Sequence, residues 1–296
     1  MNGQSVEVTL TEHPQAASIT VALTAITLVA FASNSLLCRL ALANGSIDPV
    51  SFTSLRIVSG AATLWIVSAL LRRRSRPKGS WLSATMLALY AIAFSLAYVS
   101  LSVGTGALIL MGAVQGTMIV GGIRAGERLK PTQWMGLLIA LGGTVYLVSP
   151  GITAPPVASS ILMAVAGLAW GVYSLRGRGN EDPISATTDN FIRAAPMALI
   201  MSLIQIGEVR WSTHGILLAL LSGSLTSGIG YVVWYAALRG LTATRAAIVQ
   251  LAVPVITAIG GVMILSEVIT TRLVIASLAV VGGVGLAVLL RVRTMR

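Results

Sequence analysis

The stretch GERLKPTQWMGLLIALGG, residues 126–143, has a degenerate copy in SEVITTRLVIASLAVVGG, residues 266–283. In both stretches a glutamate is followed, fifteen residues later, by a Gly-Gly pair. The match continues upstream without a gap, at a constant offset of 140 residues. Its identical pairs are Ala107 and Ala247, Thr117 and Thr257, Ile119 and Ile259, Gly121 and Gly261, Glu127 and Glu267, Leu138 and Leu278, Gly142 and Gly282, and Gly143 and Gly283. The second half of the chain is therefore predicted to be a copy of the first.

Composition places this duplicated chain in the membrane class. It is 55% hydrophobic and only 10% charged, with a mean hydropathy of +0.87, values that a soluble domain rarely reaches. A membrane-spanning helix needs about 20 apolar residues. Ten segments satisfy this requirement: 19–41, 51–71, 81–101, 104–123, 131–149, 158–176, 186–206, 213–238, 243–264 and 269–290.

Five spans fall in each copy, and that odd number decides the architecture. The second copy must enter the membrane with the opposite orientation, and inverted repeats around a midplane site are typical of secondary transporters. The predicted fold is therefore an all-α polytopic membrane protein with ten transmembrane helices in two inverted five-helix repeats, 1–149 and 158–296, joined by a linker at 150–157. Asp48-Pro49 before the second span and Asp182-Pro183 before the seventh support the duplication, since Asp followed by Pro is a common helix start.

The basic residues set the predicted topology. The net charge is +11, but fifteen of the twenty Lys and Arg residues lie in loops on one side of the predicted bundle or beside them. This is the positive-inside pattern, so both termini are expected in the cytoplasm and no nucleic-acid partner is expected. The linker 150–157 would lie outside.

The repeated motifs resemble those of a known family. The stretch from Ala107 through residues 126–131 to Gly143, and its copy with Pro254 and Glu267, resemble the signature of the drug/metabolite transporter (DMT) superfamily, in particular its ten-helix carriers with paired EamA-type domains. The first copy departs from the pattern, because Val114 stands where the second has Pro254. The chain is also similar to YddG-type exporters of aromatic amino acids. The resemblance implies a multi-pass protein of the bacterial cytoplasmic (inner) membrane that exports a small molecule.

Aromatic side chains mark the predicted binding site. They recur at helical spacing, which places them on one helix face, and a cavity lined by them would stack flat apolar ligands. An interfacial aromatic belt is the alternative. The predicted site residues among them are Tyr90, Phe94 and Tyr98 on the third span, Trp170 and Tyr173 on the sixth, and Tyr231 and Trp234 on the eighth, where Tyr235 lies next to them.

Polar side chains at membrane depth are few. Asn34, Gln115 and Gln250 are predicted to orient the polar end of a substrate, with interhelical hydrogen bonding as the alternative. Arg39 and Arg56 are expected to snorkel toward the outer face, and Arg193 to be a carboxylate anchor or a gate residue. Glu127 and Glu267 are each expected to cap the next helix in the chain rather than to bind substrate.

No acidic residue or histidine lies at mid-span, so the sequence shows no proton relay. It has no cluster of reactive groups for an enzyme, and one Cys and two peripheral His leave few metal ligands. Neither a metal nor a cofactor is therefore predicted. We expect a carrier for aromatic or hydrophobic amino acids or related metabolites, with a multidrug exporter of lipophilic cations as the alternative. Its partners would be a small-molecule substrate and the lipid bilayer, and a monomer would suffice, because each chain holds both repeats.

Overall fold

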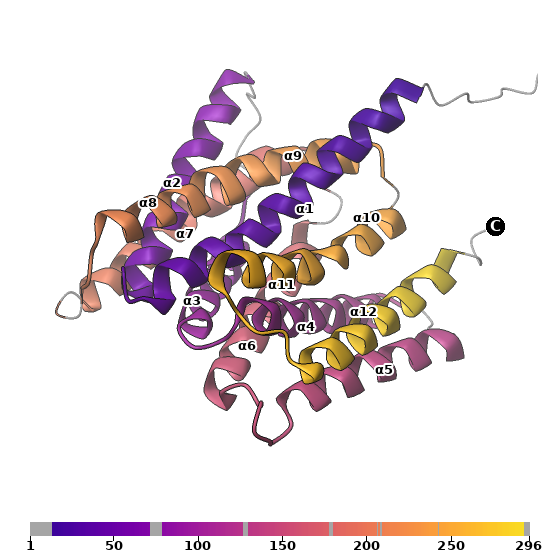
Figure 1. Cartoon of the computed structure of the whole chain (residues 1–296). Helices are drawn as coiled ribbons and strands as arrows, with labels where there is room; N and C mark the ends of the chain where they lie inside the picture. The colour runs from indigo at the N-terminus through magenta and orange to yellow at the C-terminus, as the bar shows by residue number, and fades with distance from the viewer. Residues whose placement is uncertain are drawn as a thin grey trace, which may run out of the picture.

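The computed structural model describes residues 14–71, 79–126, 130–177, 180–205, 207, 209–241 and 243–292. Glu127 and the basic cluster at 72–78 lie outside these residues. The described chain is built from helices: α1 (Pro14–Ala43), α2 (Pro49–Leu70), α3 (Trp81–Tyr98), α4 (Val103–Arg124), α5 (Pro131–Val148), α6 (Val157–Gly177), α7 (Pro183–Ile204), α8 (Thr213–Leu221), the π-helical η2 (Ser222–Ile229), α9 (Gly230–Leu238), α10 (Ala243–Gln250), α11 (Ala252–Leu265) and α12 (Thr271–Val292). All ten predicted spans are present, because α8, η2 and α9 form one rod and α10 with α11 forms another (Figure 1).

The helices have the dimensions and the surface of a membrane protein. In the described residues, eight helical segments are long and apolar enough to cross a bilayer, and α12 contributes a shorter apolar stretch, Thr271–Ala287. The α7 helix is 22 residues long but carries Asp189 and Arg193, which lower its hydropathy. Large apolar side chains such as Leu278 (71% exposed) cover the outside. The prediction of an all-α polytopic membrane protein is confirmed.

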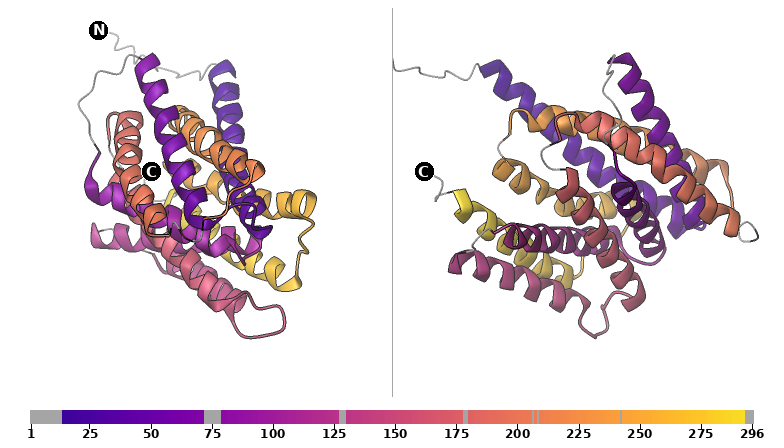
Figure 2. Two further views of the ribbon diagram at one scale, coloured as in Figure 1. Left: turned by 90° about the vertical axis from the view of Figure 1, so that its left-hand side faces the viewer. Right: turned by 180° about the vertical axis from the view of Figure 1, so that it is seen from behind.

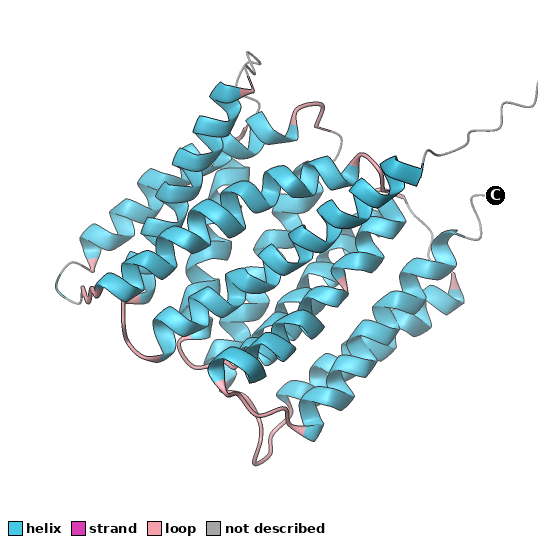
Figure 3. Cartoon of the chain, turned by 45° about the horizontal axis from the view of Figure 1, so that its top comes forward, coloured by secondary structure: helices cyan, strands magenta, loops and turns pink. Residues whose placement is uncertain are grey.

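The bundle has two ends, and each span runs from one end to the other. The helices run roughly along one direction with the loops gathered at either end (Figure 3). We call the end that carries Pro14 and Val292 the termini end, and the end that carries residues 149–156 the linker end. The α1 helix begins at the termini end, whereas α6, the first helix of the second copy, begins at the linker end. The two copies are therefore inverted, as predicted.

The main helix contacts made by one copy have equivalent contacts made by the corresponding helices of the other copy. The α3 helix packs on α6 as α9 packs on α1, and α4 packs on α6 as α11 packs on α1. Three further contacts join a helix to its own counterpart: α2 to α7, α4 to α11, and α5 to α12. The two further views show α5 and α12 lying side by side away from α2 and α7 (Figure 2). Corresponding helices of the two copies therefore both contribute to the core between them.

Local signals in the sequence explain where the helices begin and end. Asp48 caps α2 by accepting hydrogen bonds from the N–H groups of Val50 (3.1 Å) and Ser51 (2.8 Å), and Asp182 caps α7 through Ser185. Both predicted Asp-Pro starts are confirmed. Gly126 after α4 and Ser266 after α11 both adopt positive φ, at 90° and 53°. A residue with left-handed backbone conformation commonly ends a helix. Gly126 and Ser266, which are equivalent in the two copies, therefore end α4 and α11 just before the position of each glutamate of the motif.

Two spans depart from regular α-helix where they face the centre of the bundle. The eighth span contains the π-helical η2, and the ninth is interrupted at Leu251, between α10 and α11. Pro254 accounts for the interruption, because it has no N–H to donate to the carbonyl of Gln250 four residues earlier. In the first copy Val114 stands at this position, and α4 is continuous. Discontinuous helices near the midplane are a feature of transporter binding sites.

Candidate functional site

A cavity of about 580 Å³ lies between the two repeats. Helices α1, α3, α4, α6, α9 and α10, which carry predicted site residues, line it, and α2, α7, η2 and α11 contribute as well. Nine of the ten predicted site residues line this cavity: Asn34, Tyr90, Phe94, Gln115, Trp170, Tyr173, Tyr231, Trp234 and Gln250. Tyr98 is not among the lining residues.

Aromatic rings form one wall of the cavity, with Trp170 at its centre. The Trp170 ring lies 4.8 Å from that of Tyr90 on α3, 5.3 Å from that of Tyr173, and 5.5 Å from that of Tyr231 on α9, between centroids. These three tyrosines are between 6% and 7% exposed. Rings packed inside the bundle do not face lipid, so they are no interfacial belt. Trp65, Trp81, Trp134 and Trp211, in contrast, are between 46% and 68% exposed.

The cavity reaches the surface at the termini end. Its lining extends to Ser80, at the start of α3, and to Arg176 and Asn180, at and beyond the end of α6. Arg176 is exposed and donates hydrogen bonds to the hydroxyls of Ser83 (3.2 Å) and Ser80 (3.3 Å). A small molecule can therefore approach the aromatic wall from this end of the bundle.

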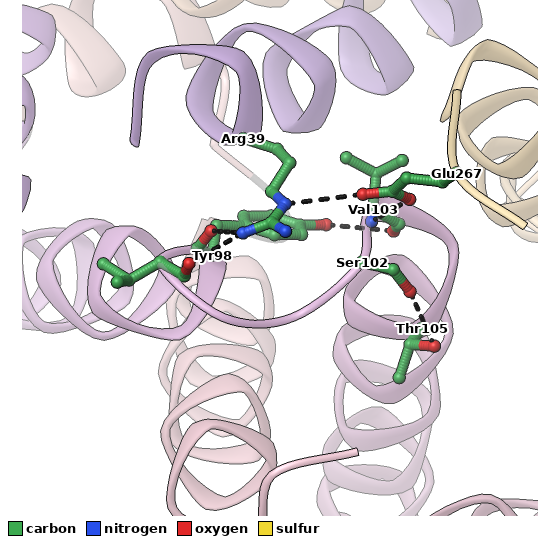
Figure 4. A network of polar contacts seen from close by, with 7 residues as sticks. Arg39, Tyr98, Ser102, Val103, Thr105 and Glu267 are labelled. Atoms are coloured by element: carbon green, nitrogen blue, oxygen red, sulfur yellow. Dashed lines mark hydrogen bonds and ion pairs between the residues drawn. The ribbon is translucent and has the colours of Figure 1, made fainter. Parts of the chain in front are cut away.

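The linker end is closed by a polar network between the repeats (Figure 4). Arg39 on α1 pairs with Glu267, Nε to Oε1 at 3.4 Å, and its Nη1 donates to the carbonyls of Tyr98 (3.0 Å) and Val99 (2.7 Å). The other oxygen of Glu267 accepts the N–H of Val103, the first residue of α4, at 2.9 Å. Glu267 thus caps a helix, but not α12, the next helix in the chain, for which the cap was predicted: it caps α4 of the opposite repeat.

Tyr98 belongs to this closure rather than to the cavity wall. Its ring is fully buried, its hydroxyl donates to the carbonyl of Val103 (3.3 Å), and its own carbonyl accepts from Arg39. Four-residue spacing correctly placed Tyr98 on the same helix face as Phe94, and their rings are 4.7 Å apart. The cavity ends before it reaches Tyr98, at the last turn of α3.

Arg56 differs most from its predicted position. It was expected to snorkel outward, but it is 4% exposed and lines the cavity. Its Nε donates to Ser227 on η2 (3.3 Å), its Nη2 donates to the hydroxyl of Tyr90 (3.2 Å), and its Nη1 is buried with no hydrogen-bond partner among the described residues. The position of a residue within its span indicates its depth in the membrane but not the direction in which its side chain points. The inward orientation of Arg56 was therefore missed.

The predicted polar residues divide into two kinds. Asn34 is occupied by the protein: its Oδ1 accepts from Ser222 (2.8 Å) and Thr226 (3.2 Å), while its Nδ2 donates to Tyr90 at 3.5 Å. Gln115 and Gln250 are half-buried in the cavity wall. For Asn34 the interhelical alternative therefore describes the contacts, whereas Gln250 and Gln115 line the cavity, the latter with its Nε2 3.8 Å from the Sδ of Met111.

Other residues extend or fall outside the predicted site. Arg193, a predicted anchor or gate, is paired with Asp189 at 3.0 Å and stacks on Trp81, away from the cavity lining. Sequence reasoning missed Phe31, which contacts both Tyr231 and Trp234. It also missed Thr226 and Ser227, although their clustering with Ser222 in the span 213–238 was a readable signal.

Comparison with known proteins agrees with this architecture. Residues 18–149 and 158–289 each match the EamA-like transporter family. An uncharacterised protein of Pseudomonas aeruginosa is 50% identical, over 90% of this chain and 93% of that protein. The uncharacterised transporter YoaV of Bacillus subtilis is 22% identical, over 80% and 86%, and an uncharacterised transporter of Archaeoglobus fulgidus is 26% identical, over 83% and 89%. A solved crystal structure shares the fold with a TM-score of 0.63 and 23% identity, covering 90% of this chain and 99% of the other.

Proposed function

The chain belongs to the EamA-like transporter family, and from this premise we propose that it is a secondary transporter that exports aromatic or hydrophobic amino acids, or related metabolites, from the cytoplasm by alternating access. The observation that carries this proposal is the aromatic cavity between the inverted repeats. It is reached from the termini end and closed at the linker end by Arg39 and Glu267. Such an arrangement represents one of the two states that an alternating-access cycle requires.

The size and chemistry of the cavity support a substrate of this kind. A volume of about 580 Å³ lies in the range of about 300–1,000 Å³ that is typical of small-molecule sites. The rings of Tyr90, Trp170 and Tyr231 offer faces for stacking a flat side chain. Gln115 and Gln250 supply amide groups for hydrogen bonds at the same level. A channel is less well supported, because a continuous polar lining would be needed.

Orientation in the membrane follows from the basic loops. The positive-inside bias places both termini in the cytoplasm, so the described state would face the cytoplasm of a bacterial inner membrane. The cavity would then load substrate from inside the cell. A single chain supplies both repeats and the whole cavity lining, which supports a functional monomer.

Counterflow in proteoliposomes tests the proposal. Vesicles preloaded with unlabelled phenylalanine should transiently accumulate external labelled phenylalanine, because a carrier exchanges substrate across a closed barrier. Unlabelled tryptophan or leucine inside should drive the same uptake, and internal glycine should not. Uptake that is equally fast with empty vesicles would indicate a channel. Uptake driven by lipophilic cations and by none of the amino acids would favour the multidrug alternative.

A further inference from the structure

We propose that Arg56 binds the carboxylate of the substrate, so that the cargo is an aromatic or hydrophobic carboxylate and lipophilic cations are excluded. This inference rests on the proposed function and specifies which charge the substrate must carry. It assigns the central binding contact to a residue whose position in the sequence suggested only an outward-facing side chain.

The first argument is the charge that Arg56 leaves unbalanced. Arginine stays protonated in proteins, and Arg56 lies seven residues into α2, about 10 Å from the linker end of the helix. The two ion pairs between described residues are Arg39 with Glu267 and Arg193 with Asp189, and neither includes Arg56. An ionised group at membrane depth is costly and marks a functional site by default. A structural role alone would call for a carboxylate partner.

The second argument is the way the guanidinium is held. Ser227 and Tyr90 fix Nε and Nη2, and the rings of Tyr90 and Phe94 lie 5.3 and 5.2 Å from Cζ. Cation–π contacts stabilise the charge but accept no directed hydrogen bond. Nη1 is buried and has no acceptor among the described residues, and beside it Nη2 has a second N–H. Together these N–H groups form the two-pronged edge that matches a carboxylate. The described part of the chain therefore positions the guanidinium and supplies no acceptor for Nη1.

The third argument is the position of Arg56 relative to the stacking surface. Tyr90 contacts the guanidinium, whose Cζ lies 5.3 Å from its ring centroid, and also the ring of Trp170, at 4.8 Å between centroids. The charge and the centre of the aromatic wall are thus neighbours of the same ring. A molecule with a carboxylate a few bonds from an aromatic ring can reach both at once.

The charge of the whole cavity favours the same cargo. Two cations line it, Arg176 near the mouth and Arg56 in the interior, and its described lining contains no aspartate or glutamate. A cleft lined by one sign of charge concentrates ligands of the opposite sign. A lipophilic cation would meet like charge near the mouth and again in the interior, and the described lining offers no carboxylate to replace its lost hydration.

Four compounds of similar shape differ in whether they carry a carboxylate, an ammonium group, both or neither, and so test which charge the site recognises. Phenylalanine carries both charges, 3-phenylpropionate only the carboxylate, phenylalanine amide only the ammonium, and 3-phenylpropionamide neither. Each is tested as a competitor of labelled phenylalanine in counterflow and as a ligand that raises the melting temperature of the purified protein. The two carboxylates should bind at least about tenfold more tightly than the two amides. Equal binding of the ammonium compound would overturn the inference while leaving the transporter proposal intact, and binding of none would overturn both.

Variants then assign the selectivity to Arg56. Arg56→Met keeps an unbranched apolar stem and removes the buried charge together with its desolvation cost. It should abolish the preference for 3-phenylpropionate over its amide, and Arg56→Lys should restore part of it. Arg193→Gln is the matched control, because that arginine lies outside the cavity lining, and it should keep the preference. If Arg56→Met weakens both compounds equally, Arg56 is structural; if it does not insert, the wild-type panel alone decides.

Discussion

At the scale of the residue, Trp170 is the point where aromatic side chains from both repeats meet. Trp170→Ala would remove contacts with Tyr90, Tyr173 and Tyr231. Aromatic pairs are worth about 0.5–1.5 kcal/mol beyond simple burial, so the variant should bind phenylalanine about tenfold more weakly. Competition in counterflow would measure this loss. Trp65→Ala is the control, because Trp65 is 61% exposed on α2; an equal loss in the two variants would mean that Trp170 contributes only to packing.

Residue spacing predicted the aromatic wall well and the charged residues poorly, for one physical reason. Spacings of three and four place side chains on one face of a helix, and burial of Tyr90, Phe94 and Tyr231 shows that this face is turned inward here. Such spacing cannot say where along the helix a cavity ends, which is why Tyr98 was included. A lone arginine such as Arg56 has no partner at helical spacing that could reveal the direction it faces. The packing of α2 against α7, η2 and α3 determines that direction.

At the scale of the element, the two glycines of each Gly-Gly pair have different surroundings. A Cβ on Gly283 of α12 would collide with the backbone of Gly136 on α5, and one on Gly143 of α5 would lie 2.6 Å from the Cβ of Ala279 on α12. Gly142 and Gly282 have open space around their Cβ positions. The second glycine of each pair therefore allows α5 and α12 to approach closely, and the first does not.

This difference predicts opposite outcomes for adjacent substitutions. Gly283→Ala should destabilise the protein by about 1–3 kcal/mol, the usual range for overpacking, because both helix backbones would have to separate. Gly282→Ala should have little effect, and the same contrast should hold for Gly143→Ala and Gly142→Ala. Melting temperatures of the purified variants in detergent would measure it. Equal melting temperatures for the adjacent pair would show that α5 and α12 are not in close contact.

The irregular elements were the least predictable part of the fold. The interruption between α10 and α11 can be read from Pro254, since proline removes a backbone hydrogen bond. The π-helical η2 has no such signal in its sequence. Its serine and threonine side chains hold Asn34 and Arg56, so the irregular turn is stabilised by partners on α1 and α2. A local reading of residues 213–238 cannot include contacts with helices so distant in the chain.

At the scale of the whole molecule, the inverted repeat could be predicted because its signals are global. An odd number of spans per copy forces the inversion, and a constant offset of 140 residues fixes which helices correspond. The state of the molecule could not be predicted in the same way. Both states of an alternating-access cycle are formed by one sequence, so the repeat pattern does not say which state is observed. Closure at the linker end involves contacts between residues far apart in the chain, among them the pairing of Arg39 with Glu267.

That pairing leads to a prediction about the conformational equilibrium. Glu267→Gln keeps an oxygen that can accept the N–H of Val103 but removes the charge that attracts Arg39. The two side chains are 20% and 17% exposed, and a pair of this kind contributes at most about 1 kcal/mol. Losing it should increase the fraction of molecules open at the linker end about fivefold.

Labelling of an introduced cysteine would measure the shift. In a Cys38→Ala background, Leu36→Cys places a thiol where α1 packs against Gly260 of α11, between the repeats. A membrane-impermeant maleimide added to intact cells should label it about fivefold faster when Glu267→Gln is present. Asp48→Asn, which neutralises another carboxylate at the linker end, should leave the rate unchanged. Thr153→Cys in the exposed linker should label rapidly in every background if the linker lies outside the cell. Rapid labelling at 153 without acceleration at 36 would mean that the closure does not depend on the Arg39–Glu267 pair, whereas no labelling at 153 would reverse the topology.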